Sequence, residues 1–126
     1  MRLLIVDDHS AMRRLLGRVV HDLCDAIVEC EDGADALAAY EQHRPDWVLM
    51  DIEMNRTDGI TATRAITMSF PDAKIVIVSK HDDQQLRAAA QAAGACGYVL
   101  KDNLIAVREL LEKPNVPHGT SQKRSR

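Results

Sequence analysis

Short, almost wholly apolar runs alternate along the chain with stretches in which apolar residues recur every three or four positions. Four runs have the length and composition of buried strands: Leu3–Val6, Trp47–Met50, Ile75–Val78 and Tyr98–Leu100. A fifth and more polar run, Ile27–Val28, is flanked by acidic residues, as is typical of a strand at the edge of a sheet. The pattern therefore predicts five strands.

The stretches between and after the strands predict helices. In the first of them, Ser10 is the expected N-cap, and the apolar positions repeat at helical spacing: Met12, Leu15, Leu16, Val19, Val20 and Leu23. Gly94 is the expected C-cap of the fourth helix. Either Asp102 or Asn103 is expected to cap the last helix.

Apolar strands that alternate with helices predict an α/β fold. Two Asp-Gly pairs, Asp32-Gly33 and Asp58-Gly59, open helices shortly after the second and third strands. Such a pattern favours a parallel sheet with helices on both faces. Right-handed crossovers then favour a doubly wound, flavodoxin-like sheet of five strands in the order 2-1-3-4-5.

The chain has room for one domain and a short tail. We expect a compact domain over residues 1–112 of the 126. From Lys113 onward, Pro114, Pro117 and Gly119 interrupt any regular pattern, and basic residues follow. Residues 113–126 are therefore expected to be a flexible basic tail or the start of an interdomain linker.

Charge and cysteine content exclude several classes of function. The net charge is −3 and the pI about 5.9, so the folded body is not expected to bind nucleic acid or a membrane surface. The three cysteines show no C-x-x-C spacing and fit a reducing cytoplasm. No signal peptide or membrane-spanning apolar run is present, so we expect a cytoplasmic protein.

Polar residues stand where the predicted strands end. Asp7 and Asp8 follow the first strand, Asp51 the third, Ser79 the fourth and Lys101 the fifth. In an open parallel sheet these ends meet at one crevice. Three close carboxylates repel each other unless a cation intervenes, and oxygen ligands suit Mg²⁺. Together with an ammonium and a hydroxyl, they predict a site that moves phosphate onto a protein carboxylate.

Four motifs together resemble the receiver domain of two-component response regulators. The resemblance covers about residues 2 to 112, with every motif in the expected order. Some stretches, such as VDDH and AAGACGYVLKD, look most like receivers that precede a helix-turn-helix DNA-binding domain. The motifs that carry the resemblance are LLIVDDH from Leu3, MDIEM from Met50 with Asp58-Gly59, Val78-Ser79, and GYVLK from Gly97.

The resemblance implies a role for each strand-end residue. Asp51 would accept phosphate from a sensor histidine kinase or a phosphotransfer protein, and Lys101 would bind that phosphate. Asp8 would contact Mg²⁺ directly and Asp7 mainly through water. Asp51 and the backbone carbonyl of Glu53 would complete the protein ligands of the ion.

The resemblance also implies how the signal leaves the site. Ser79 corresponds to the switch hydroxyl and Tyr98 to the switch aromatic residue. Their movement would change the surface of the fourth helix, fifth strand and fifth helix. That change would control an output, expected to be transcription. The same surface would offer a face for a homodimer. Such a domain assists its own phosphorylation and dephosphorylation but is not a turnover enzyme.

Two residues depart from the family pattern. Asn55 replaces the usual proline after Met54, which leaves the rigidity of the loop behind the phosphoacceptor open. Lys80 replaces a usually small residue after the switch hydroxyl. Glu53 and His81 are predicted to lie at the rim, where water would approach a phosphoryl group.

Other functions fit the sequence less well. The departures at Asn55 and Lys80 favour one alternative, a degenerate receiver that acts as a phosphate-independent docking scaffold. A flavodoxin-type FMN carrier needs a phosphate loop where Asp7-Asp8 stands, and a phosphatase of the haloacid dehalogenase type needs Asp-x-Asp there. His9 and His81 lack the third His or Cys of a soft-metal site.

Overall fold

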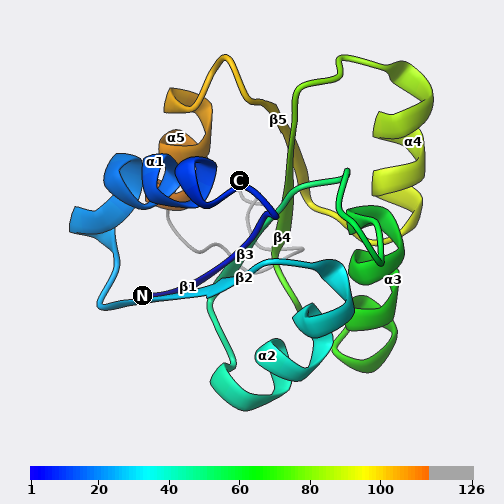
Figure 1. Cartoon of the computed structure of the whole chain (residues 1–126), viewed down its shortest axis with the longest axis horizontal. Coiled ribbons are helices and arrows are strands. Elements are labelled where there is room, and N and C mark those ends of the chain that lie inside the picture. Colours follow the sequence, from blue (N-terminus) through cyan, green and yellow to red (C-terminus); the bar gives the residue numbers. More distant parts are fainter. Residues whose placement is uncertain (114–126) are drawn as a thin grey trace, which may run out of the picture.

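A five-stranded parallel sheet forms the centre of the fold (Figure 1). The computed structural model describes residues 1–113, so the predicted tail from residue 114 onward lies outside the described residues. The strands lie in the order β2-β1-β3-β4-β5, which confirms the predicted topology. They are β1 (Arg2–Val6), β2 (Ala26–Cys30), β3 (Trp47–Met50), β4 (Ile75–Ser79) and β5 (Gly97–Leu100).

Helices cover both faces of the sheet, as the doubly wound prediction requires. One face packs against α1 and α5, and the other packs against α2, α3 and α4 (Figure 1). The helices are α1 (Ser10–Val20), α2 (Ala36–His43), α3 (Gly59–Ser69), α4 (Gln84–Ala92) and α5 (Ile105–Glu112), with 3₁₀ turns at His21–Leu23 and Gly33–Asp35.

The alternation of side chains along each strand builds two separate cores. In β1, Leu3 and Ile5 point toward α1 and α5, whereas Leu4 and Val6 point toward the other helices. All four side chains are fully buried. A strand buried on both faces must be apolar at every position, which explains the continuous apolar runs in the sequence.

The start of α3 and the end of α4 lie close to the predicted positions, and the backbone conformation after α4 requires a glycine. The Asp58 side chain accepts from the Thr61 N–H at 2.9 Å and caps α3. The C-cap of α4 is Ala93, and Gly94 lies one residue later than predicted, with φ of +107°. A Cβ atom there would also lie 2.7 Å from the Thr67 side chain, so glycine ends this helix for two independent reasons.

Two other predicted caps are wrong. His9 occupies the N-cap position of α1, where its carbonyl accepts from the Met12 and Arg13 N–H groups, and Ser10 is already helical. At α5 the N-cap is Leu104, with no side-chain cap, and the Asn103 carbonyl accepts from the Ala106 N–H just before it. No side chain caps the N-terminus of either helix in the described structure.

A guanidinium group ties α5 to the end of α1. The two terminal nitrogens of Arg108 lie 2.7 and 2.8 Å from the carboxylate oxygens of Asp22, and Nη1 also donates to the Val19 carbonyl. The hydrogen bonds from Arg108 lower the pKa of Asp22 from 3.8 to about 2.

No helix among residues 1–113 is long and apolar enough to span a membrane.

We expect the Asp22–Arg108 pair to stabilise the fold at neutral pH and to stop doing so in acid. The folded-state pKa of Asp22 is depressed, so its contribution is present above about pH 4 and is lost as pH falls toward 2. Urea unfolding of Asp22→Asn should show a lower midpoint than the native chain at pH 7. That difference should shrink between pH 4 and pH 2, and a constant difference would contradict the ion pair.

Candidate functional site

The register of the sheet brings the predicted polar residues to one edge. Val6 pairs with Met50, so the residues that follow them, Asp7 and Asp51, emerge side by side. The Asp51 N–H donates to the Val6 carbonyl at 2.9 Å. The carboxyl ends of neighbouring parallel strands therefore place these two aspartates together, as the sequence pattern predicts.

Lys101 lies between the two buried carboxylates. Its Nζ atom is 3.1 Å from Asp51 Oδ1 and 3.2 Å from Asp7 Oδ2. The side chains of Asp7 and Asp51 are only 2% and 6% exposed, and that of Lys101 is 16% exposed. Buried charges of this kind persist only when they are paired, so each of the three depends on the others.

Burial and neighbouring charges shift the pKa values of Asp51 and Lys101. Burial and the neighbouring Asp7 raise the pKa of Asp51 above its ordinary value, although Lys101 acts in the opposite direction. Burial would lower the pKa of Lys101, but Asp51 and Asp7 raise it on balance. Lys101 therefore stays an ammonium, while Asp51 would gain from a further cation that favours its ionised form.

The donor atoms fit a hard divalent cation. Asp7, Asp8, His9 and Asp51 each offer one ligand atom, and these atoms all lie within 4.8 Å of one another. Asp7 Oδ2 and Asp8 Oδ1 are buried without a hydrogen-bond partner among the described residues, although Lys101 and His9 lie nearby in ion-pair contact. Unpartnered carboxylate oxygens at this spacing are what a Mg²⁺ ion would satisfy.

His9 is a neighbour whose contacts the sequence did not reveal. Its Nδ1 atom lies 2.9 Å from Asp8 Oδ1 and 3.4 Å from Asp7 Oδ1, and its side chain is 73% exposed. The only signal in the sequence is its position directly after the acidic pair. His81 is not part of this group, so the two histidines do not form a joint site.

The backbone of His81 links the two predicted switch residues. Ser79 is buried, and its Oγ atom accepts from the His81 N–H at 3.0 Å. The Tyr98 hydroxyl donates to the His81 carbonyl at 2.7 Å. The backbone of a single residue thus contacts both side chains.

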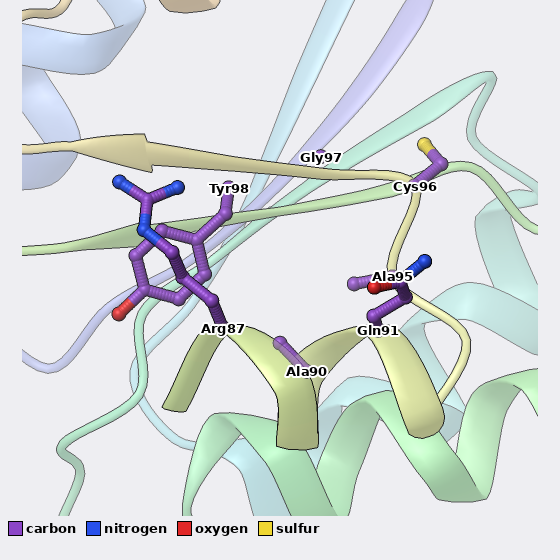
Figure 2. A pocket seen from close by; sticks show the side chains of 7 residues that line it. All are labelled: Arg87, Ala90, Gln91, Ala95, Cys96, Gly97 and Tyr98. Carbon is purple, nitrogen blue, oxygen red and sulfur yellow. The ribbon is translucent and has the colours of Figure 1, made fainter. Parts of the chain in front are cut away.

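The ring of Tyr98 forms part of a pocket between α4 and β5. Figure 2 shows the Arg87 side chain reaching from α4 across the ring, where the guanidinium carbon is 4.6 Å from the ring centroid. Gln91 and Cys96 line the same pocket. The hydroxyl end of Tyr98 thus faces the loop that follows β4, and its ring faces the surface of α4.

The predicted rim residues form a small cluster of their own. Glu53 Oε1 lies 3.2 Å from His81 Nε2 and 3.7 Å from Lys80 Nζ. A hydrogen bond from His81 lowers the pKa of Glu53. Lys80 is 69% exposed and extends toward Glu53, while Asn55 is exposed on the loop after β3.

Comparison with known proteins agrees with this geometry. The family model described as "Response regulator receiver domain" matches residues 3–113. The chain belongs to this family. Receiver domains are signalling domains rather than classical enzymes, and they bind Mg²⁺ at an acidic pocket, such as the one formed here by Asp7, Asp8 and Asp51.

Individual relatives support the same family membership for this receiver. It is 34% identical over 103 residues to the transcriptional regulatory protein DegU of Brevibacillus brevis, covering 80% of this chain and 44% of that protein. A crystal structure of a LuxR-family response regulator from Aurantimonas sp. SI85-9A1 superposes with a TM-score of 0.78 and 32% identity, covering 87% of this chain and 84% of that chain.

A third match is a complex that contains CheY. The structure of the CheX-CheY-BeF3-Mg+2 complex from Borrelia burgdorferi matches with a TM-score of 0.80 and 26% identity, covering 90% of each chain.

The receiver spans about half the length of the first curated relatives it matches, with coverage of 44%, 58% and 48%. The matches to transcriptional regulators confirm the predicted resemblance to receivers of that kind.

We expect Mg²⁺ to stabilise this receiver through the carboxylate group. At about ten times its dissociation constant, the ion should raise the free energy of unfolding by about 1.4 kcal/mol. Asp8→Asn should abolish this increase and should be no less stable than the native chain without the ion, because it removes a charge with an unpartnered buried oxygen. Thermal unfolding with and without MgCl₂ measures both effects.

Asp46→Asn is the matched control for this experiment. Asp46 precedes β3 and accepts from the Arg2 N–H at the opposite end of the sheet, so this variant should keep the full response to Mg²⁺. An equal response in Asp8→Asn and in the native chain would show that the ion binds elsewhere.

Proposed function

We propose that this receiver accepts a phosphoryl group on Asp51 from a sensor histidine kinase or a phosphotransfer protein, in a reaction that requires Mg²⁺. The observation that carries the proposal is the Lys101 ammonium, 3.1 Å from Asp51 Oδ1 at the crevice edge of the sheet. A carboxylate beside a fixed cation has the nucleophile and the charge partner that phosphoryl transfer needs. Family membership supports the same assignment.

The chemistry of the transfer places defined demands on these residues. A carboxylate oxygen of Asp51 attacks phosphorus, the bond from phosphorus to the donor nitrogen breaks, and the leaving imidazole takes up a proton. The Lys101 ammonium offsets the negative charge that develops on the transferring oxygens. The Lys101 ammonium already contacts Asp51 and Asp7, so a short movement away from Asp7 would bring it to an oxygen of the phosphoryl group on Asp51.

The group that would hold Mg²⁺ consists of Asp8, with Asp7 through water, Asp51 and the backbone carbonyl of Glu53. The unpartnered oxygens of Asp7 and Asp8 support this set. Bound there, the ion would neutralise charge on the phosphoryl oxygens. The Borrelia burgdorferi relative, whose structure contains both BeF3 and Mg2+, gives the proposal a precedent within the family.

We propose that Ser79 and Tyr98 carry the signal outward. The Ser79 hydroxyl accepts from His81, so its own hydrogen remains free to be donated to a phosphoryl oxygen. A shift of Ser79 toward the phosphoryl group would pull on the His81 N–H, and the carbonyl of the same residue holds the Tyr98 hydroxyl. The signal would thus reach the surface of α4, β5 and α5.

The output and the partners follow from the relatives. Because DegU and other matched proteins are transcriptional regulators, we propose that the receiver controls transcription from the cytoplasm, as part of a two-component system. The surface of α4, β5 and α5 is the proposed site of a homodimer. The alternative, a phosphate-independent docking scaffold, gains no support from Lys80, whose ammonium lies beside Glu53.

We expect the native chain to take up one acid-labile phosphoryl group from phosphoramidate in the presence of Mg²⁺. Asp51→Asn should take up none, and Lys101→Ala should react at least tenfold more slowly, since it removes a cation that contacts the acceptor. Intact-protein mass spectrometry measures the uptake. Phosphorylation that persists in Asp51→Asn would overturn the acceptor assignment, and none in the native chain would favour the scaffold.

We expect Tyr98→Phe to separate phosphoryl uptake from signalling. The substitution removes only the hydroxyl that donates to the His81 carbonyl, so uptake should stay within about threefold of the native rate. Amide NMR shifts on phosphorylation should cluster in residues 80–105 of the native chain and should be much smaller there in Ser79→Ala and Tyr98→Phe. Shifts confined to the loops after β1 and β3 would show that the switch is uncoupled.

A further inference from the structure

A buried aspartate on a neighbouring strand holds the loop that follows the phosphoacceptor. Asp32 follows β2, and the residue is only 4% exposed. Its Oδ2 atom accepts from the Arg56 N–H at 2.8 Å, and its Oδ1 atom accepts from the Thr57 N–H at 3.0 Å. Both donors belong to the loop at residues 52–58, between β3 and α3.

The turn around Asp32 and the loop are also in close steric contact. A Cβ atom on Gly33 would lie 2.6 Å from the Thr57 carbonyl oxygen, so only glycine permits this approach. At the other end of the loop, a Cβ atom on Gly59 would lie 1.8 Å from the Asp51 carbonyl oxygen, and the Gly59 N–H donates to Ile52. The loop is therefore held both at its middle and where it joins α3.

Asp32 acts here as an ionised acceptor. Burial alone would raise its pKa, but the N–H groups of Ala34, Arg56 and Thr57 lower it on balance. Hydrogen bonds to a charged acceptor are stronger than bonds between neutral groups. By contrast, the ion pair between Arg56 and Asp35 joins two largely exposed side chains and contributes little.

The sequence of the loop contains no residue that restricts its backbone. Residues 52–58 contain no proline, and Asn55 stands in the middle of the segment. The backbone of this loop is therefore not restricted by a ring, and its conformation depends on contacts from outside. The same loop carries the Glu53 carbonyl, so its position affects the proposed ion site.

We propose that Asp32 is a positioning residue, which clamps the loop at residues 52–58 and thereby fixes the backbone of Asp51 and Glu53 for phosphoryl transfer. The proposal rests on the proposed function. The competing interpretation is a local helix cap, because Asp32 Oδ1 also accepts from the Ala34 N–H at 2.9 Å. Only the Oδ1 atom serves that cap, whereas the bond from Arg56 to Oδ2 joins two separate segments.

The test compares Asp32→Ala with Asp58→Ala and combines each with Asn55→Pro. Asp58 is a matched control, because it caps α3 through Thr61 and its side chain makes no hydrogen bond to residues 52–57 in the described structure. Asn55→Pro restricts the loop by a different means and cannot restore the cap at Ala34. The Asn55 N–H makes no hydrogen bond within residues 1–113, so the substitution removes none.

Two quantities are measured for each variant, namely amide hydrogen exchange at Arg56 and Thr57 and the rate of phosphorylation by phosphoramidate at saturating Mg²⁺. Asp32→Ala should speed exchange by about tenfold at each of these two amides, since each loses one hydrogen bond to a charged acceptor, and should slow phosphorylation by about tenfold. In the Asp32→Ala background, Asn55→Pro should raise the phosphorylation rate several-fold. The same substitution in the native chain should raise that rate by a smaller factor. Asp58→Ala should change neither quantity more than twofold.

A second variant keeps the test decisive if Asp32→Ala folds poorly. Asp32→Asn keeps one oxygen acceptor but places an NH₂ group opposite the Arg56 N–H, so exchange should speed up more at Arg56 than at Thr57. Equal effects of Asp32→Ala and Asp58→Ala, or no additional recovery by Asn55→Pro, would reduce Asp32 to a local cap. Exchange requires no phosphoryl donor, so the clamp can fail independently of the proposed function.

Discussion

The pairing of one buried ammonium with two buried carboxylates is the interaction on which the rest of this receiver depends. Lys101 lies within 3.2 Å of both Asp7 and Asp51, and none of the three has extensive access to solvent. Such a group is stable only where a rigid frame holds all its members, because each unpaired charge would be costly to bury. The parallel sheet supplies that frame through the register of β1, β3, β4 and β5.

Different contacts hold the loops on the two sides of this group. The Asp32 carboxylate holds the loop after β3 from the side of β2, while the His81 backbone joins Ser79 to Tyr98 on the side of β5. In the proposed function, the Asp32 contacts would stay in place when the charge at Asp51 changes, while the His81 contacts would shift. This asymmetry is a physical reason for a signal to leave toward α4 and β5.

The sequence predicts the features that depend on periodicity and on strand ends. Continuous apolar runs indicate strands buried on both faces, and the ends of those strands place Asp7, Asp51 and Lys101 together. Two features escape this reasoning, the contact of His9 with the acidic pair and the reach of Asp32 across to the β3–α3 loop. Both arise from the approach of separate loops, for which the sequence carries no periodic signal.

A crystal structure of the chain with Mg²⁺ and beryllofluoride, a tetrahedral stand-in for a phosphoryl group, would test the charge arrangement at Asp51. The anion should be bonded to a carboxylate oxygen of Asp51, with the ion held by Asp8 and the Lys101 ammonium moved from Asp7 toward a fluorine atom. A structure in which Lys101 still bridges Asp7 and Asp51, or in which the anion binds away from Asp51, would contradict the proposed chemistry of the site.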